Sequence, residues 1–449
     1  MNQEILNKPF DPEDLYLYSL RKMAESNLDK NRTNLTNLMN LRAFLYKADD
    51  LIRYSDDKYA IIVMDIAGFK LVNEFCSRQD GDALLMHIAD CFRFYESEKT
   101  AVAHFRADIF ALCTPYEQES DLIDIVNRLS DQIKAFPVAC KVLPAFGICT
   151  ATDKTLSASH IQDCAFMAQK TVKGKYFANY AFFDKSMHDK MLWEKKIENT
   201  FDEALAGDQF QLYIQPKVDM TTGRIIGGEA LVRWMQPEAG MIPPGEFIPV
   251  LEKNASIIDL DKCIWEKTFR FISDLKAKHG IEIPISINIS RLHAYDKHLV
   301  ETLQNLSAMY QVAPSLVPLE LTESAYSENE ELMYQKIKAL KACGFLFSMD
   351  DFGSGYSTMN MLVSQPVDEV KIDRAFLFHI GNPKSQTLVR HTISMLHDLD
   401  LPIVIEGVEN NEQRKLLTEW GCKYAQGFLF HKPMPAENFK NLLLMQNAS

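Results

Sequence analysis

The sequence predicts an α/β protein in which a C-terminal TIM-like (β/α)8 barrel with one antiparallel strand follows an α/β domain. Three observations predict this fold class. The chain has 449 residues, more than a single hydrophobic core usually organises. Its first half alternates helical and strand patterns. Its second half repeats short β-rich segments, most of them separated by helix-length stretches, and βα units repeated over about 250 residues are typical of this barrel.

The first half divides into three stretches. Residues 1–35 are predicted to be a helical lead-in, 36–188 an α/β domain, and 189–206 a helical connector that no Pro or Gly interrupts before Gly207. Within the α/β domain the pattern predicts a buried strand, an amphipathic helix, a strand pair, an extended segment and a helix. In order, these are Tyr59–Ile66, Leu84–Phe94, Ala103–Cys113, Val138–Thr152 and His160–Lys173. Residues 207–449 then form the barrel domain.

Eight β-rich segments of the second half are the expected barrel strands. They are Gln211–Asp219, Ile226–Trp234, Ile283–Ser290, Pro318–Ser324, Leu346–Phe352, Glu369–Arg374, Ile403–Val408 and Tyr424–Phe430. Only the turn Met220–Gly223 separates the first two segments, whereas a parallel crossover needs about a dozen residues or more. The first two strands must therefore pair antiparallel, and the barrel should contain one reversed strand.

Charge and composition limit the partners. The formal net charge is −13, which argues against a DNA or RNA duplex, because proteins that bind duplexes through bulk electrostatics are usually basic. A small anionic ligand is compatible where metal ions or local cations supply positive charge. Residues 1–14 lack the apolar core of a signal peptide, and no apolar run is long enough to insert into a membrane. The nine cysteines are scattered without a C-x-x-C pair, as expected for reduced thiols in the cytoplasm.

Polar residues stand at or near the ends of the predicted strands. They are Glu229, Asn288, Glu320, Glu323, Asp350, Asp351, Lys371, Asp373, Glu406, Glu409 and Gln426. In a barrel these ends converge on the active-site face. A single acid there is usually a solvated loop charge, but so many carboxylates in one mouth would repel one another unless cations neutralised them. Because the ligands are oxygen atoms, with no His or Cys at these ends, we expect Mg²⁺ or Mn²⁺ rather than zinc.

The adjacent pair Asp350 and Asp351 is the most informative part of this pattern. Successive side chains on a strand point to opposite faces, so both acids reach one site only if the chain leaves strand geometry, which Gly353 and Gly355 permit. Two adjacent carboxylates can bridge metal ions ~3.5–4 Å apart. Lys371 has two interpretations: it orients or activates an attacking water, or it forms a structural salt bridge with a neighbouring carboxylate. From these residues alone, a metal-assisted lyase or hydrolase acting on another small anion stays open.

Seven strings between residues 200 and 440 resemble, in order, the motifs of the EAL family of cyclic di-GMP phosphodiesterases. They are Q-P at 215–216, E-A-L at 229–231, L-E-L-T-E-S at 319–324, D-D-F-G-S-G-Y-S at 350–357, V-K-I-D-R at 370–374, E-G-V-E at 406–409 and Q-G-F at 426–428. The resemblance implies metal-dependent hydrolysis of cyclic di-GMP to linear pGpG by two divalent cations. EAL-like domains with damaged metal sites act instead as cyclic di-GMP receptors, which is the alternative function.

The resemblance also implies a role for each matching position. The first metal ion would be held by Glu229, Asn288, Glu320 and Asp350. The second would be held by Asp350, with Asp351 and Glu406 nearby. Catalysis would involve Glu229, Glu406 and Lys371. Of these, Lys371 would contact the nucleophilic water. Glu323 would anchor the loop 352–359. The substrate groove would be lined by Gln215, Leu231, Arg233 (against a phosphate), Asp373, Glu409 and Gln426.

Residues 36–188 resemble, more loosely, the GGDEF family of diguanylate cyclases. L-T-N-L-M-N at 35–40 and D-I-A-G-F-K at 65–70 are similar to two of its motifs, and Asn73, Gly81 and Asp82 match positions that hold guanine. The name motif itself reads R-A-D-I-F at 106–110. Side chains at Arg106 and Ala107 would crowd the nucleotide where the family has glycines. Ile109 cannot coordinate a metal ion.

This domain therefore resembles a degenerate cyclase in which, of the acidic metal-binding positions, only Asp65 and Asp108 remain. No cyclase activity is expected. One interpretation is a regulator that still binds GTP through Asn73 and Asp82. The other is a structural or dimerising remnant, which the damaged phosphate-binding turn favours. Because EAL proteins often dimerise through the barrel, the resemblance also implies a homodimer.

Overall fold

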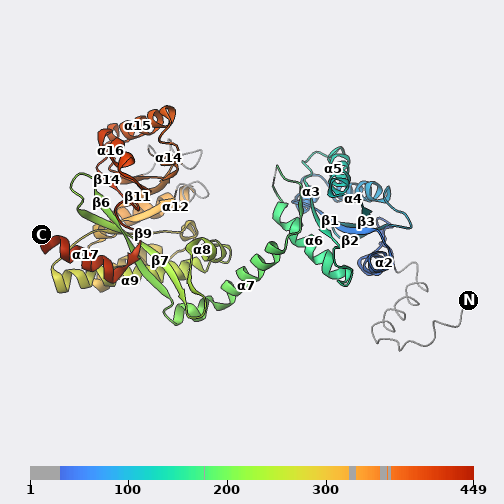
Figure 1. Ribbon diagram of the computed structural model, residues 1–449, viewed down its shortest axis with the longest axis horizontal. Helices are drawn as coiled ribbons and strands as arrows, with labels where there is room; N and C mark the ends of the chain where they lie inside the picture. Colours follow the sequence, from blue (N-terminus) through green and yellow to red (C-terminus); the bar gives the residue numbers. More distant parts are fainter. Residues whose placement is uncertain (1–30, 176, 323–329, 354–361, 363–365, 449) are drawn as a thin grey trace, which may run out of the picture. The chain divides into compact units, whose positions relative to one another are not determined.

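The structure is a computed structural model that describes residues 31–175, 177–322, 330–353, 362 and 366–448 (Figure 1). The chain forms two compact units that divide between Trp193 and Glu194. Most of the predicted lead-in lies outside the described residues. Its described end forms a turn, in which an isolated bridge joins Arg32 to Met39.

The first unit is built on a five-stranded sheet in the order β2-β3-β1-β4-β5. Its strands are β1 (Lys58–Ile66), β2 (Ala101–Arg106), β3 (Ile109–Tyr116), β4 (Pro144–Thr150) and β5 (Tyr180–Phe182). The central strand β1 pairs antiparallel with both β3 and β4. It is buried from Tyr59 to Ile66, as expected for a strand that is covered on both faces.

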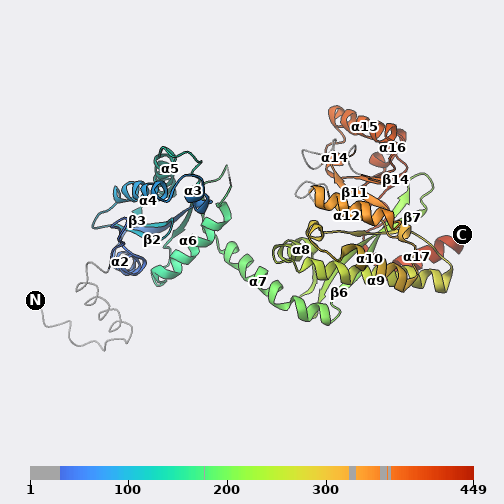
Figure 2. The same cartoon turned by 180° about the vertical axis from the view of Figure 1, so that it is seen from behind.

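Helices cover both faces of this sheet (Figures 1 and 2). The helices are α2 (Leu41–Tyr54), α3 (Phe69–Phe75), α4 (Arg78–Arg93), α5 (Glu119–Lys134) and α6 (Ala158–Val172). Even-numbered residues of β1 pack with α3, α4 and α5, and odd-numbered residues pack with α2 and α6. The alternation follows from the two-residue period of a strand. The predicted elements of this domain are present, except that residues 138–143 of the predicted extended segment form no strand before β4.

A long helix, α7 (Lys185–Ala206), leads into the barrel strands. Its buried residues are Ile197, Phe201 and Ala204. Their spacing of four and three residues places them on one helical face. The predicted connector, residues 189–206, lies entirely within this helix.

Eight strands in the described part of the second unit close into a barrel, in the order β6-β7-β9-β10-β11-β12-β13-β14 and back to β6. They are β6 (Phe210–Asp219), β7 (Ile225–Gln236), β9 (Ile285–Asn288), β10 (Leu319–Thr322), β11 (Phe347–Phe352), β12 (Glu369–Ile372), β13 (Ile403–Ile405) and β14 (Tyr424–Ala425). Two short strands pair antiparallel beside them, β8 (Gly240–Ile242) with β7 and β15 (Met434–Pro435) with β6. The helices are α8 (Pro244–Lys253), α9 (Ile257–His279), α10 (Leu299–Tyr310), α12 (Glu330–Ala342), α14 (Ala375–Phe378), α15 (Pro383–Asp398), α16 (Asn411–Glu419) and α17 (Ala436–Ala448).

The barrel contains the expected reversed strand, which is β6. It pairs antiparallel with β7 and with β14. The other seven barrel strands, β7 and β9 to β14, pair parallel with one another. The tight turn after β6 is closed by a hydrogen bond from Gly223 N to Asp219 O (2.8 Å), and Gly223 adopts a φ of 71° that glycine tolerates easily. The predicted fold class is thus confirmed.

Among the barrel strands that are followed by described residues, four end earlier than predicted. Two of them are β9, which ends at Asn288, and β12, which ends at Ile372. β13 ends at Ile405 and β14 at Ala425, so Glu406 and Gln426 follow their strands. Both residues lie just beyond the carboxyl ends of their strands. In the described part of the chain, no helix is both long enough and apolar enough to cross a membrane.

Candidate active site in the barrel

The carboxyl ends of the barrel strands bring their polar side chains together at one mouth. Glu320 on β10 pairs in register with Asn288 on β9 and with Ser348 on β11, so these strands reach the mouth at matched heights. The buried members of the group are Glu229 on β7, Glu320 on β10, Asp350 on β11, Lys371 on β12 and Gln426 after β14. Residues that are far apart in the sequence therefore share one site, as expected for a barrel of this kind.

Lys371 lies at the centre of this mouth. Its Nζ atom is within ion-pair distance of carboxylate oxygens of Glu229 (3.1 Å), Glu320 (2.8 Å), Asp350 (2.9 Å) and Glu406 (2.6 Å). The lysine side chain is 1% exposed, and a buried ammonium is tolerated only with such partners. Four carboxylates around one ammonium leave an excess of negative charge. The salt bridges predicted for Lys371 are present, and its contact with water stays a prediction.

The pKa values of the acids divide the mouth into two parts. Burial, together with the charges of Asp350 and Glu229, raises the pKa of Glu406 to about 8, although Lys371 opposes the shift. Burial and the neighbouring Glu320 also raise the pKa of Glu229. Burial acts on Glu320 in the same direction, but the ammonium groups of Lys217 and Lys371 lower its pKa to about 2. Glu320 therefore keeps its charge, whereas Glu229 and Glu406 have too few positive neighbours to offset their burial.

The same carboxylates raise the pKa of Lys371. Burial alone would lower the pKa of this ammonium, but Asp350, Glu229, Glu320 and Glu406 together raise it well above its ordinary value. Lys371 is therefore a permanent positive charge at neutral pH.

Asp351 reaches the site of Asp350 through an irregular backbone. Its φ is 54°, a left-handed conformation that few residues other than glycine adopt. The pairing of β11 with β12 also shifts register between Met349 and Phe352. The chain leaves strand geometry as expected, but at Asp351 itself. Gly353 follows with a φ of 92°, and Gly355 lies outside the described residues.

This bend completes a group of three acids. One carboxylate oxygen each from Asp350, Asp351 and Glu406 lies within 4.8 Å of the others. Burial and the charge of Asp350 raise the pKa of Asp351 to about 6. Three close oxygen donors of this kind suit a hard divalent cation.

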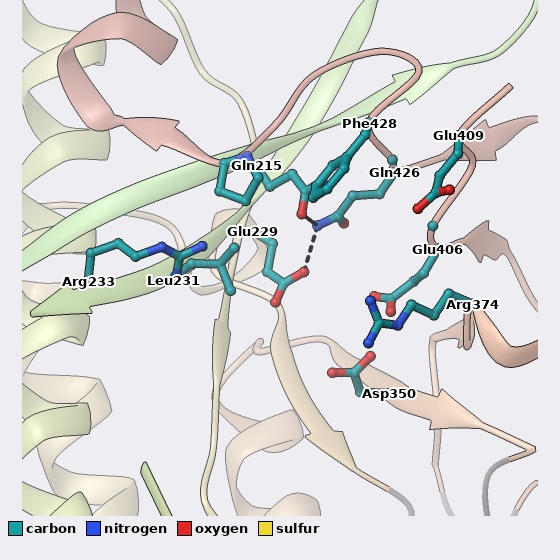
Figure 3. A pocket seen from close by; sticks show the side chains of 13 residues that line it. Gln215, Glu229, Leu231, Arg233, Asp350, Arg374, Glu406, Glu409, Gln426 and Phe428 are labelled. Atoms are coloured by element: carbon teal, nitrogen blue, oxygen red, sulfur yellow. Dashed lines mark hydrogen bonds between the residues drawn. The ribbon is translucent and has the colours of Figure 1, made fainter. Parts of the chain in front are cut away.

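A cavity of about 310 Å³ opens over these acids (Figure 3). The predicted residues that line it are Gln215, Glu229, Leu231, Arg233, Asp350, Glu406, Glu409 and Gln426. Gln426 Nε2 donates to Gln215 Oε1 (2.9 Å) and to Glu229 Oε2 (2.8 Å), which joins the wall of the cavity to the acids. Arg233 and Arg374 lie on opposite sides of this group (Figure 3).

In the described part of the chain, the predicted residues of the barrel site that do not line this cavity are Asn288, Glu320, Asp351, Lys371 and Asp373. Asn288 Nδ2 donates to Glu229 Oε1 (3.2 Å), and Asn288 lines a neighbouring cavity of about 100 Å³. Asp373 Oδ1 accepts a hydrogen bond from Ala375 N (2.8 Å) at the start of α14. Glu323 lies outside the described residues, as does most of the loop that it was expected to anchor.

The sequence analysis missed further residues at this site, four of which have charged or aromatic side chains. Arg374 and Phe428 line the cavity, and both stand within the motifs V-K-I-D-R and Q-G-F, so motif membership was an available signal. Lys217 and Glu369 lie beside Glu320 and are absent from the cavity lining. The available signal for Lys217 was its spacing of two residues from Gln215, which predicts the same strand face.

In the first unit, a smaller acidic site contains Asp65 and Asp108, the two acids that the sequence analysis assigned to metal-binding positions of the degenerate cyclase. Lys173 Nζ lies 2.5 Å from Asp65 Oδ2, and Asp108 Oδ2 accepts a hydrogen bond from Ile66 N (3.1 Å). Burial and the neighbouring Asp65 raise the pKa of Asp108 to about 6. The sequence analysis did not assign Lys173 to this site.

The altered name motif forms the turn between β2 and β3. Arg106 and Ala107 are exposed, and Ala107 has a φ of 49°, which a glycine would adopt with less strain. Ile109 begins β3 and packs against the α2–α6 core. At the positions predicted to hold guanine, a β-carbon on Gly81 would come within 1.9 Å of Asn73 Oδ1. Asp82 follows Gly81 on α4 and is half-buried.

Comparison with protein families matches both units. The profile described as "EAL domain" matches residues 198–433, and the profile described as "Diguanylate cyclase, GGDEF domain" matches residues 31–175. Bifunctional diguanylate cyclase/cyclic di-GMP phosphodiesterase MucR of Pseudomonas aeruginosa is 30% identical over 93% of this chain and 62% of its own length. Cyclic di-GMP phosphodiesterase PdeR of Escherichia coli is 28% identical over 91% of this chain and 63% of its own length. The chain thus spans less than two thirds of either relative.

Solved structures agree with these matches. A structure of the PaMucR phosphodiesterase in complex with c-di-GMP resembles 54% of this chain and 99% of its own, with 34% identity and a TM-score of 0.52. The S helix-GGDEF-EAL structure of Vibrio cholerae LapD shares the fold over 93% of this chain and all of its own, with 15% identity and a TM-score of 0.53. Because the EAL profile matches more than half of the sequence, this chain belongs to the EAL domain family, with a GGDEF domain preceding its EAL domain.

Proposed function

We propose that this protein hydrolyses cyclic di-GMP to linear pGpG with two divalent cations, Mg²⁺ or Mn²⁺. The observation that carries the proposal is the barrel mouth, where four carboxylates surround Lys371 beneath a cavity. Relatives that align with nine tenths of the chain are named cyclic di-GMP phosphodiesterases. Site and relatives therefore support the same chemistry.

The donor atoms fit two hard cations. One ion would be held by Glu229, Asn288, Glu320 and Asp350. The other would be held by Asp350, Asp351 and Glu406, whose oxygens are already close together. Carboxylate and amide oxygens are the preferred ligands of Mg²⁺ and Mn²⁺, and the excess negative charge around Lys371 favours their binding. When bound, the ions would polarise the phosphodiester and lower the pKa of a water molecule.

The protein's own side chains would bind and orient the substrate. Hydrolysis adds one water to a phosphorus atom and breaks its bond to the ribose 3′ oxygen, which leaves as a hydroxyl group. Lys371 would hold the attacking water and stabilise charge that develops on the phosphoryl oxygens. Arg233 would bind a phosphate at the edge of the cavity, and Gln426 would hold Glu229 in place through its amide.

We also propose that the first unit makes no cyclic di-GMP and has a regulatory or structural role. Lys173 pairs with Asp65, where a metal ligand would be needed, and Ile109 offers no oxygen donor. Calorimetric titration with GTP separates the two roles. Heat release together with a changed hydrolysis rate would assign a GTP-binding regulator, and no heat would assign a structural remnant. Sedimentation of the purified chain tests whether it forms the expected homodimer.

The test of the main proposal is a hydrolysis assay on the purified chain. Cyclic di-GMP is incubated with Mg²⁺ or Mn²⁺, and pGpG is followed by chromatography. We expect pGpG to form and EDTA to stop its formation. If the ligand binds and survives in the presence of either cation, the protein is a cyclic di-GMP receptor and the hydrolysis proposal is wrong.

A further inference from the structure

A second buried ammonium lies beside the mouth of the barrel. Lys217 stands two residues after Gln215 on β6, so the two side chains share the interior face of the barrel. Lys217 is 6% exposed. Its Nζ atom donates to Glu320 Oε1 (2.8 Å) and lies 3.3 Å from Glu369 Oε1. The hydroxyl of Ser348 donates to the same oxygen of Glu369 (2.9 Å).

Glu320 is held from two sides by this arrangement. Its Oε1 atom accepts from Lys217, and its Oε2 atom accepts from Lys371 (2.8 Å). The carboxylate is fully buried, so water cannot replace either partner. Rotation of the carboxylate would break at least one charged hydrogen bond, and such bonds are about twice as strong as neutral ones.

Lys217 acts outside the substrate cavity. The cavity lining includes Gln215 and Glu229 but neither Lys217 nor Glu369. The Nζ atom of Lys217 contacts Glu320 and Glu369 and not the acids that line the cavity, so any effect of Lys217 on the reaction is expected to pass through Glu320.

We propose that Lys217 is a positioning residue, which holds Glu320 with its Oε2 atom toward the mouth and thereby raises the affinity of the barrel for divalent cations. The inference rests on the proposed metal site, in which Glu320 is a ligand. Outer residues that orient metal ligands typically contribute about 10–100-fold to metal affinity. Lys217 has this relation to Glu320, which it contacts directly.

The sign of the effect distinguishes positioning from simple electrostatics. An ammonium near a metal site repels a cation, so charge alone predicts that removal of Lys217 tightens metal binding. Positioning predicts the opposite. Without Lys217, the carboxylates of Glu320 and Glu369 face each other with no cation between them, and Glu320 turns toward Lys371. The metal then loses an aligned ligand.

The experiment measures Mn²⁺ binding by the full chain without substrate, from the electron paramagnetic resonance signal of free Mn²⁺. We expect Lys217→Met to weaken Mn²⁺ binding by about tenfold or more. Lys217→Gln, which can still donate a hydrogen bond to Glu320, should recover part of the loss. The matched control is Glu369→Gln. It retains an acceptor for Lys217 and for Ser348, so its Mn²⁺ affinity should stay within about twofold of the wild type.

Unchanged or tighter Mn²⁺ binding by Lys217→Met would overturn the inference. Fluorescence of the buried Trp234 and Trp265 shows whether each variant has kept its barrel. If Lys217→Met unfolds, Lys217→Gln decides by the same measurement, because unchanged or tighter binding by that variant is also contrary to positioning. If the wild type binds no Mn²⁺, the proposed metal site fails. If it binds Mn²⁺ and both lysine variants match it, only the role of Lys217 fails.

A second measurement separates positioning from a general structural effect. At saturating Mn²⁺, Lys217→Met should recover most of the wild-type kcat, because the lost step is metal binding. A kcat that stays low when the metal site is full would place Lys217 in the chemical step and contradict the positioning role.

Discussion

Each half of the molecule places a lysine among carboxylates, but the balance of charge differs. In the barrel, Lys371 contacts four carboxylates and its side chain is 1% exposed. In the first unit, Lys173 contacts Asp65, its side chain is 41% exposed, and the nearby Asp108 has a pKa raised to about 6. The two acids of the first site exceed their lysine by one, whereas the four carboxylates around Lys371 exceed it by three, so the barrel site has the stronger demand for further cations. An acidic cluster thus indicates a metal site more strongly the further its carboxylates exceed its own bases.

Substitution of one acid at each site should give the largest difference between the two units. Glu229→Ala should lower cyclic di-GMP hydrolysis by about 1000-fold or more, because Glu229 joins Lys371, Asn288 and Gln426 at the proposed metal centre. Asp65→Asn in the first unit should leave the rate within about twofold, since that site takes no part in the reaction. The rate of pGpG formation is measured, with circular dichroism to check the fold. Metal-dependent activity retained by Glu229→Ala would remove the barrel mouth from the mechanism.

Removal of each lysine tests the balance of charge directly. Without divalent cations, Lys371→Met should lower the free energy of unfolding of the barrel by about 3–5 kcal/mol, because it leaves buried carboxylates without their counter-ion. Lys173→Met should change the stability of the first unit by about 1 kcal/mol or less, since its partner pair is partly exposed. Urea unfolding followed by tryptophan fluorescence reports the barrel, and hydrogen exchange reports the first unit. Equal losses of unfolding free energy in the two variants would contradict the proposed difference in charge balance between the two sites.

Divalent cations should act on one unit and spare the other. At about 100 times its dissociation constant, a bound ion stabilises the folded state by about 2.7 kcal/mol. We expect Mn²⁺ to raise the free energy of unfolding of the barrel by this amount, which is measured as a higher urea midpoint. The exchange rates of β1 and β3 amides in the first unit should stay unchanged. Protection of those amides by Mn²⁺ would show that Asp65 and Asp108 still hold a metal ion.

The smallest expected effect concerns Asp108. Because its folded pKa of about 6 lies above the ordinary 3.8, the native state holds this proton more tightly. Its contribution to stability is present below about pH 4 and is lost as the pH rises through 6. Asp108→Asn should therefore stabilise the first unit by about 1 kcal/mol at pH 7.5, after allowance for its partial exposure, and by little at pH 4.

Hydrogen exchange of β1 and β3 measures this difference at the two pH values. The exposed Asp56→Asn is the control, which should have no such pH dependence. An equal gain for Asp108→Asn at both pH values would exclude the raised pKa as its cause.

The order of the barrel strands was readable from the sequence for physical reasons. Strand segments have a distinct residue pattern, and the short turn at Met220–Gly223 permits only an antiparallel pair. Once a barrel is expected, its strand ends must converge, so the polar residues that follow β13 and β14 could be assigned to the mouth even though both strands end early. Topology and the choice of site residues follow from local patterns of this kind.

Contacts between distant side chains were not readable in the same way. Nothing local predicts that Lys217 reaches Glu320 across 103 positions, or that Lys173 reaches Asp65 across 108. Such contacts depend on strand register and on the direction of long side chains, which only the folded barrel or sheet determines. The bend at Asp351 was expected at the glycines, because residue type alone favours glycine for a positive φ.

The closure of the barrel by β6 against β14 delays the formation of its mouth until β14 has been synthesised. Gln426 donates to Gln215 across 211 positions of the chain. At about 5–20 residues per second, a ribosome needs roughly 10–40 s to translate that interval. During this interval, the edge of β6 that later pairs with β14 has no partner strand. Unpaired strand edges of this kind are prone to aggregation, and chaperones act on such chains. A chain still short of residue 426 lacks one wall of the barrel mouth, so the proposed active site cannot form until that residue has been synthesised.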